Sequence, residues 1–367
     1  MLVFLLGAAL PTFAKDEVKK PAKSQIEVCF VLDTTGSMSG LIEGAKQKIW
    51  SIANEIISAK PTPDIRIGLI GYRDKGDEYV LKTFDLTNDV DAIYGKLQSF
   101  RADGGGDQPE SVNEALDAAV NQMTWSTNRS VLKIIFLVGD APPHMDYANA
   151  PKYPNVCQAA MKKDLIVNTV QCGNIADTTP IWKEIAKLSE GNFAAIAQSG
   201  NMAVVSTPMD AKLAELNRQI GTTLVAYGSA RTRREVVAKQ ALSEAAPAAV
   251  AADRLYFNFK NDVTVQGEGE LLDDLANGKL KLESVKKDQL SPEMQKLSDA
   301  DLKAEIEKKQ KERTELQAQI QKLSQERADY IAQEIKRNAG KADSFDENVA
   351  ATIREQAARK GIIYAGE

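Results

Sequence analysis

The sequence predicts an α/β protein: a doubly wound, mostly parallel sheet of six strands, followed by an α-rich C-terminal extension with a long helix. Apolar, β-rich runs alternate with helical patterns from residue 26 to about residue 227, which is typical of parallel strands joined by helices. Residues 133–138 (KIIFLV) are almost continuously apolar, as expected for a strand covered on both faces. Only residues 73–78 separate the second and third strands, so that pair is expected to be an antiparallel hairpin.

Each element of this sheet domain can be assigned a range. The helices between and after the strands are recognised by apolar residues at three- and four-residue spacing. The strands are expected at residues 26–32, 65–72, 79–86, 132–138, 165–171 and 192–197. The helices are expected near residues 40–59, 89–99, 109–124, 152–163, 179–189 and 208–226.

Beyond residue 228 the composition changes. Residues 229–254 are rich in alanine and basic side chains and are interpreted as a linker, helical or extended. Residues 255–290 form a small mixed segment, with short strands expected at 255–259 and 263–265.

Residues 291–367 are expected to be a helical extension. Its first part, to residue 340, has apolar residues at helical spacing, but Lys309, Arg313 and Arg327 interrupt the apolar seam. A full coiled coil needs a more continuous seam, so a helical hairpin or a partly docked helix is favoured. A last helix is expected over residues 345–359.

Charge and histidine content exclude several classes of protein. The net charge of −5 argues against a nucleic-acid partner, because nucleic-acid-binding proteins normally carry a strongly basic face. The single histidine excludes sites that need two or three imidazoles, such as zinc-protease centres. No apolar run approaches the roughly 18 residues of a transmembrane segment.

Residues 1–14 resemble an export signal, with a short apolar stretch followed by small residues at 12 and 14. The basic segment that usually opens such a signal is missing, so its start lies upstream or has been lost. Residues 15–24 would then be a charged linker, and the protein is expected to be exported, periplasmic or secreted. In an oxidising compartment a Cys157–Cys172 disulfide is compatible with the expected helix–strand pair, whereas Cys29 is expected to be a buried free thiol.

The residues that carry chemistry follow the ends of two strands. Asp33, Thr35 and Ser37 follow the first strand, and their alternation lets three oxygens converge. A glycine-rich loop at 103–110 and Asp140, at the end of the fourth strand, belong to the same sheet edge, where ligands bind in open parallel sheets. Hydroxyls and carboxylates without thiolate or imidazole favour Mg²⁺ or Mn²⁺.

These residues resemble the metal-ion-dependent adhesion site of von Willebrand factor A-type domains, whose fold is shared with integrin inserted domains. The family's Asp-x-Ser-x-Ser motif is matched by Asp33, Thr35 and Ser37, and its third-loop aspartate by Asp140. Its second-loop threonine falls at Asp107, where this sequence differs. The segments GYRD (71–74) and GGGDQPE (104–110) resemble a bacterial and kinase-associated branch, and the whole chain resembles exported bacterial members with helical C-terminal extensions.

The resemblance implies a Rossmann-like A-type domain over residues 25–228 that binds Mg²⁺ (or Mn²⁺) and, through it, another protein or a surface polymer, without catalysis. With Asp107, three carboxylates would surround one cation, which raises metal affinity and weakens the attraction for an acidic partner. If Asp107 points away, Glu110 or a water completes the shell. The metal ligands are thus expected to be Asp33, Thr35, Ser37, Asp107 and Asp140, and the partner-contacting rim to include Asp74, Glu110 and His144.

Two other functions are compatible with the sequence. Residues 36–40 (GSMSG) only approximate Gly-x-Ser-x-Gly, because Met38 holds the central position; a serine hydrolase would use Ser39 as nucleophile and His144 as base. This match is disfavoured because the pattern begins too late after the strand and because Asp140 and His144 share one loop. Alternatively, the protein is a scaffold in which the metal is purely structural and only holds the loops together.

Overall fold

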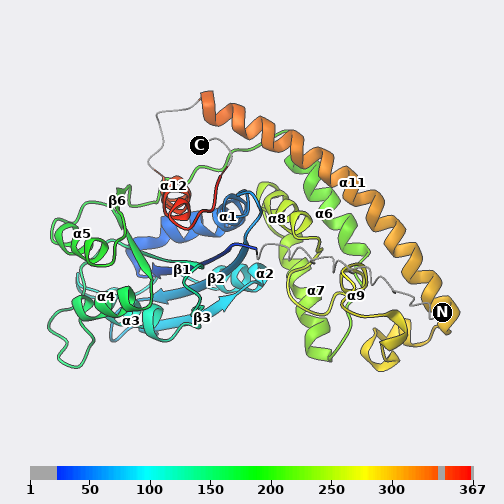
Figure 1. Cartoon of the computed structure of the whole chain (residues 1–367), viewed down its shortest axis with the longest axis horizontal. Helices are drawn as coiled ribbons and strands as arrows, with labels where there is room; N and C mark the ends of the chain where they lie inside the picture. The colour runs from blue at the N-terminus through cyan, green and yellow to red at the C-terminus, as the bar shows by residue number, and fades with distance from the viewer. Residues whose placement is uncertain (1–22, 338–343, 365–367) are drawn as a thin grey trace, which may run out of the picture.

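The computed structural model of the chain describes residues 23–337 and 344–364. A six-stranded sheet with flanking helices forms one part, and a helical region lies beside it (Figure 1). The predicted export signal, residues 1–14, and most of the predicted linker lie outside the described residues. The strands are β1 (Gln25–Asp33), β2 (Asp64–Tyr72), β3 (Leu81–Thr87), β4 (Leu132–Gly139), β5 (Ile166–Cys172) and β6 (Phe193–Ile196).

The sheet has the strand order β3-β2-β1-β4-β5-β6, and every neighbouring pair is parallel except β2 and β3. The predicted fold class and the antiparallel hairpin are therefore confirmed. In the register of the central strands, Leu32 lies opposite Gly71 of β2 and Val138 of β4. Strands β1 and β4 consequently end side by side, at the switch point of the strand order, and this is where ligands bind in such sheets.

Helices cover both faces of the sheet, as the almost uninterrupted burial of β1 and β4 requires. Side chains alternate between faces along β1, so Phe30 packs on one face and Val31 on the other. The helices joined to the sheet in sequence are α1 (Ser39–Ile56), α2 (Val90–Gln98), α3 (Val112–Asn121), α4 (Tyr153–Lys162) and α5 (Thr178–Leu188).

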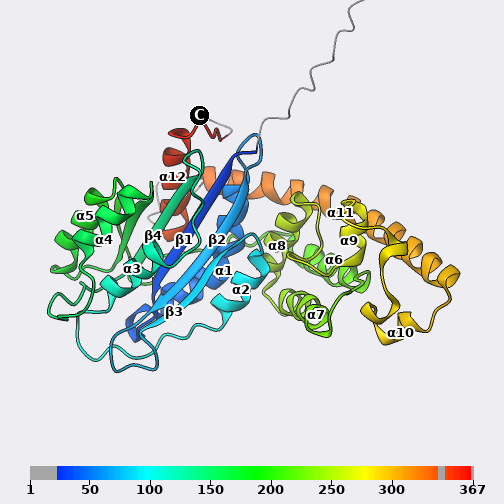
Figure 2. The ribbon, with the colours of Figure 1, turned by 60° about the horizontal axis from the view of Figure 1, so that its bottom comes forward.

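The last helix of the chain, α12 (Phe345–Ala358), packs on the sheet and not on the long helix that precedes it. Figures 1 and 2 both show it beside α1. The Phe345 ring lies 6.3 Å from the Phe30 ring, and the Phe345 N–H donates to the Gly200 carbonyl at 2.9 Å. The predicted helical extension is thus divided, because its end completes one face of the sheet domain.

The helical region spans residues 210–337. Residues 229–254, interpreted as a helical or extended linker, are helical: they consist of α7 and the start of α8, which pack against their neighbours. The short strands expected at 255–259 and 263–265 are wrong, since the first lies within α8 and the second has no regular structure. The helices are α6 (Asp210–Thr222), α7 (Ala230–Glu244), α8 (Ala248–Lys260), α9 (Leu271–Ala276), α10 (Pro292–Gln295) and α11 (Asp299–Arg337), and short 3-10 turns occupy Leu282–Ser284 and Lys287–Gln289.

The long helix α11 is partly docked, as one of the two sequence interpretations had it. It packs on α6 and α8 through Leu316 and Ile320 (Figure 1). Arg313 and Arg327, which interrupt its apolar seam, are buried in ion pairs: Arg313 with Glu270 and Asp273, and Arg327 with Asp210 and Asp253.

The three cysteines are free and buried. The expected Cys157–Cys172 disulfide is absent because the two thiols lie on opposite faces of the sheet: Cys172 packs in the cluster under α1 and α12, and Cys157 in the cluster under α3, α4 and α5. Within the described residues, no helix combines the length and the apolar character needed to cross a bilayer.

Candidate functional site

The first loop of the site follows β1. The Thr35 hydroxyl donates to Asp33 Oδ1 at 2.7 Å, the Thr35 N–H donates to the same oxygen at 2.8 Å, and Thr35 Oγ1 lies 3.4 Å from Ser37 Oγ. The oxygens of these three side chains therefore converge, as their alternation predicts. Asp33 is completely buried, whereas Ser37 is exposed to solvent.

The second contribution comes from the end of β4. Asp140 is buried, and its charge raises the pKa of Asp33. Gln198, in the loop after β6, donates to Asp140 Oδ2 at 2.7 Å and to the Ser37 carbonyl at 3.3 Å, so it ties the two loops together. No motif in the sequence points to Gln198.

The glycine-rich loop lies against the first loop. The Gly36 N–H donates to the Gly104 carbonyl at 3.2 Å, and Gly104 and Gly105 have φ angles of 78° and 85°, which favour glycine. A Cβ at Gly105 would lie 3.3 Å from both Glu110 Oε1 and Thr35 Cβ. Glycine at 105 thus lets the loop pass close to both side chains.

Glu110 is only 3% exposed and points into the site. Its pKa is raised to about 9, first by burial and then by the charges of Asp33, Asp74, Asp77 and Asp140. The pKa of Asp33 is raised to about 7, mainly by burial and further by Asp140, although hydrogen bonds from Thr35 act in the opposite direction. Asp33 Oδ2 and Glu110 Oε2 are buried without a hydrogen-bond partner.

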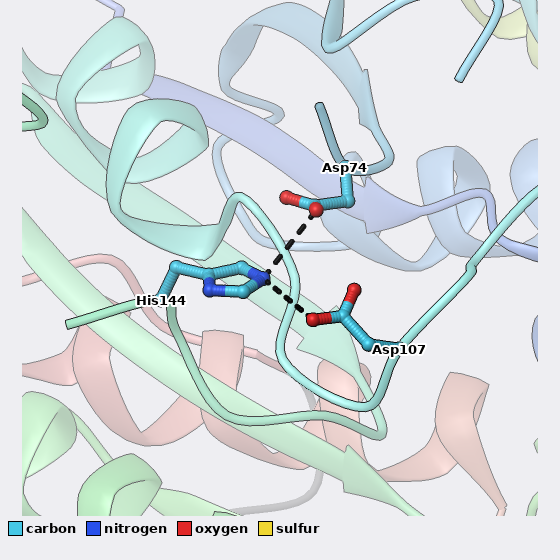
Figure 3. A group of neighbouring side chains, drawn as sticks. All are labelled: Asp74, Asp107 and His144. Carbon is cyan, nitrogen blue, oxygen red and sulfur yellow. Dashed lines mark ion pairs between the residues drawn. The ribbon is translucent and has the colours of Figure 1, made fainter. Parts of the chain in front are cut away.

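Asp107 lies in a second group of side chains, with Asp74 and His144. In Figure 3 the carboxylates of Asp74 and Asp107 both face His144 Nε2, at 3.4 and 3.7 Å. Asp107 is therefore turned toward His144, and Glu110 is the carboxylate of this loop whose pKa the charges of Asp33 and Asp140 raise.

The expected rim of Asp74, Glu110 and His144 is not an exposed rim. All three side chains are buried. The Ser111 hydroxyl donates to Asp74 Oδ1 at 2.9 Å, and the Tyr147 hydroxyl donates to Asp74 Oδ2 at 2.7 Å. A partner can reach the exposed residues Ser37 and Asp107 more easily than these three.

The arrangement of His144 does not support the hydrolase alternative. Nδ1 of its ring lies 2.8 Å from Asp146 Oδ1, and Nε2 faces Asp74 and Asp107. Both ring nitrogens therefore face carboxylates, and neither is directed to Ser39, which begins α1. A general base must lie within hydrogen-bond reach of its nucleophile or be linked to it by a water.

The doubly wound sheet, with acidic and hydroxyl side chains gathered where β1 and β4 end, defines a class of domain with a polar binding site at its switch point. Residues 27–207 match the family model of the von Willebrand factor A domain. The chain belongs to the von Willebrand factor A-type domain proteins.

Several known proteins share this domain. Alpha-protein kinase vwkA of Dictyostelium discoideum is 27% identical over 42% of this chain and 25% of its own length. The mouse von Willebrand factor A domain-containing protein 7 is 35% identical over 34% of this chain and 12% of its own length. The chain thus matches a quarter or less of each of these relatives. Among solved structures, the SpRpn10 VWA domain aligns with 50% of this chain and 100% of its own, at 13% identity and a TM-score of 0.37.

Proposed function

We propose that the loops after β1 and β4 hold one divalent cation, Mg²⁺ or Mn²⁺, and that the protein binds another protein or a surface polymer through this site without catalysis. The proposed ligands are oxygens of Asp33, Thr35, Ser37 and Asp140. Glu110, and not Asp107, completes the set from the glycine-rich loop.

The observation that carries this proposal is the pair of orphaned carboxylate oxygens, Asp33 Oδ2 and Glu110 Oε2. A carboxylate buried without a cation or donors costs several kcal/mol, and the raised pKa values of both groups express this cost. Among the described residues, no lysine or arginine forms an ion pair with Asp33, Glu110 or Asp140. A divalent cation supplies the missing positive charge.

The donor set also selects the kind of cation. All five proposed ligands offer oxygen, from three carboxylates and two hydroxyls, and hard cations such as Mg²⁺ and Mn²⁺ prefer oxygen ligands. Ser37 and the glycine-rich loop are exposed, so one side of the pocket is open to solvent and to a partner.

The charge of the pocket affects the choice of partner. Three carboxylates around one divalent cation leave a net negative charge, so an additional carboxylate from a partner is attracted weakly. We therefore expect the partner to contribute neutral oxygens or a basic surface. Glu110→Gln removes one negative charge and should raise the affinity of the metal-loaded protein for acetate, used as a carboxylate probe.

Calorimetric titration with Mg²⁺ and Mn²⁺ tests the site. The wild-type chain should bind one cation, and Asp33→Asn, which keeps the shape of the side chain, should lose most of this binding. Asp117→Asn, a change on the less buried face of α3, is the matched control and should bind as wild type. Equal heats from wild type and Asp33→Asn would contradict the proposed site.

A purely structural metal is the second candidate. In that case chelation would lower the melting temperature but would leave the binding of any partner unchanged. Enzymatic activity is not part of this proposal: von Willebrand factor A domains are generally non-catalytic, and the kinase named above matches this chain over only a quarter of its own length.

Export to the periplasm or the medium is the remaining part of the proposal. It rests on the apolar stretch at residues 2–10 and the small residues that follow it. Fractionation of cells that express the chain, with detection of the processed N-terminus, tests it directly.

A further inference from the structure

We infer that Asp74, Asp107 and His144 form a second metal site, separate from the oxygen-only pocket, and that it binds a cation that accepts nitrogen, with Zn²⁺ as the test ion. One ligand atom from each of the three residues lies within 4.8 Å of the other two. They come from three loops: after β2, before α3 and after β4 (Figure 3). This inference does not depend on the cation proposed for the Asp33 pocket.

The position of the His144 ring is fixed by its surroundings. The His144 N–H donates to the Glu110 carbonyl at 3.1 Å, and its own carbonyl accepts from Asn113 Nδ2 at 2.9 Å. Its ring stacks on Tyr147 with centroids 4.0 Å apart. Hydrogen bonds therefore fix the backbone of His144, and Tyr147 covers one face of its ring. Only 6% of the side chain is exposed.

The hydrogen bond at Nδ1 determines which ring nitrogen can bind a metal. Nδ1 lies 2.8 Å from Asp146 Oδ1, and a carboxylate only accepts hydrogen bonds, so Nδ1 carries the proton. In the neutral ring Nε2 then has the free lone pair. Nε2 is buried, has no hydrogen-bond partner, and faces two carboxylates. A carboxylate behind a metal-binding histidine is the usual arrangement that orients such a ligand.

The distances fit a shared cation better than a protonated histidine. A charged imidazole would hydrogen-bond to a carboxylate at about 2.7–2.9 Å. The observed distances from Nε2 are 3.4 Å to Asp74 and 3.7 Å to Asp107. Metal bonds of about 2.0–2.2 Å in a tetrahedral site separate ligand atoms by about 3.3–3.6 Å, which is close to what is observed.

The surroundings of the three residues leave one coordination position of a bound cation open to solvent. Asp74 is held by Ser111 and Tyr147, whereas the side chain of Asp107 is 64% exposed, so that side admits water or a ligand. Imidazole with two carboxylates suits Zn²⁺, in contrast to the imidazole-free pocket around Asp33. Glu110 lies between the two sites, since the charges of both Asp33 and Asp74 raise its pKa.

Zinc titration of the untagged full chain in excess Mg²⁺ tests this inference. Wild type should bind one Zn²⁺. His144→Gln and Asp107→Asn should weaken binding at least about tenfold, and Asp146→Asn about tenfold. Asp33→Asn should leave zinc affinity unchanged while it abolishes the magnesium response. Metal-free melting curves confirm that each variant folds.

His144 is the only histidine of the chain, which gives a second readout. Its NMR resonances should shift on addition of one equivalent of Zn²⁺ in both wild type and Asp33→Asn. Unchanged zinc affinity in His144→Gln, or loss of zinc in Asp33→Asn, would overturn the second site. Wild type that binds no zinc would overturn it as well. The proposed function fails separately, if magnesium binding survives Asp33→Asn.

Discussion

Buried carboxylates occur in both halves of this molecule, but they are neutralised differently. In the helical region, Arg313 forms ion pairs with Glu270 and Asp273 at 2.7 and 2.8 Å. Where the helical region meets the sheet domain, Arg254 of α8 holds Asp91 of α2 through two hydrogen bonds of 2.6 and 2.9 Å. At the ends of β1 and β4, by contrast, two buried carboxylate oxygens have no partner.

The difference shows how a structural acid can be distinguished from a ligand-binding acid. A folding unit that needs a buried carboxylate only for its own packing supplies a matching cation from the chain. The loops of the sheet domain bring acids together without one, which costs stability unless an external cation binds.

Arg313→Met should destabilise the protein by about 3–5 kcal/mol, because it leaves Glu270 and Asp273 buried without their cation. Urea or thermal unfolding measures the change. Arg218→Met is the control: its pair with Glu215 is exposed to solvent, so its loss should change the stability far less. Equal losses from the two variants would remove the distinction between buried and exposed pairs.

Divalent cation should stabilise the sheet domain and leave the helical contacts unchanged. At a free Mg²⁺ concentration 100 times the dissociation constant, the free energy of unfolding should rise by about 2.7 kcal/mol. Thermal unfolding with Mg²⁺ and with a chelator measures this, and Asp33→Asn should show no such gain. If the melting temperature of the wild type were the same with Mg²⁺ and with a chelator, the pocket would not be stabilised by metal, which would contradict this prediction.

The stability of the metal-free protein should fall as the pH rises from 5 to 7. Folded Asp33 keeps its proton up to a pKa of about 7, whereas the unfolded carboxyl loses it near 3.8. Between these values folded Asp33 binds more protons than the unfolded carboxyl, so this group alone lowers the free energy of unfolding by up to about 1.4 kcal/mol per pH unit, and Glu110, with its pKa of about 9, acts in the same direction. Unfolding curves in the presence of a chelator measure the slope, which Asp33→Asn should reduce. A stability that increases with pH over this range would contradict the unpaired pocket.

The same substitution should have opposite effects at an unpaired and at an arginine-paired buried carboxylate. Without metal at pH 8, Asp33→Asn removes an unpaired buried charge and should stabilise the protein by about 1 kcal/mol. Asp91→Asn removes a charge that Arg254 neutralises and should destabilise it. Chemical denaturation of both variants under one set of conditions gives the comparison, and effects of the same sign would refute it.

The sheet could be predicted from sequence because each strand carries its own signal. Continuous apolar runs identified the buried strands, and the short connection at 73–78 identified the antiparallel pair. The first loop of the site was predicted for the same reason, since Asp33, Thr35 and Ser37 are close in sequence and their alternation alone brings them together.

Features that depend on tertiary packing were not predictable in this way. Residues 255–259 have β-like composition, yet Phe257 packs on Trp50 as part of α8. In the sequence, Arg313 and Arg327 interrupt the apolar seam of α11. Their buried partners are not evident there because they lie 40 to 117 residues away in the chain. The directions of Asp107 and Glu110, three residues apart in one loop, follow from the neighbours that each side chain meets.

The return of α12 to the sheet has a practical consequence for any attempt to study the domain alone. An expression fragment that stops at residue 207, where the family match ends, would strip Phe345, Val349 and Ile353 from the apolar surface that includes Phe30. Such a fragment should be prone to aggregation. A minimal domain would have to keep both α8 and α12, since Phe257 packs on Trp50 and Phe345 bonds to Gly200.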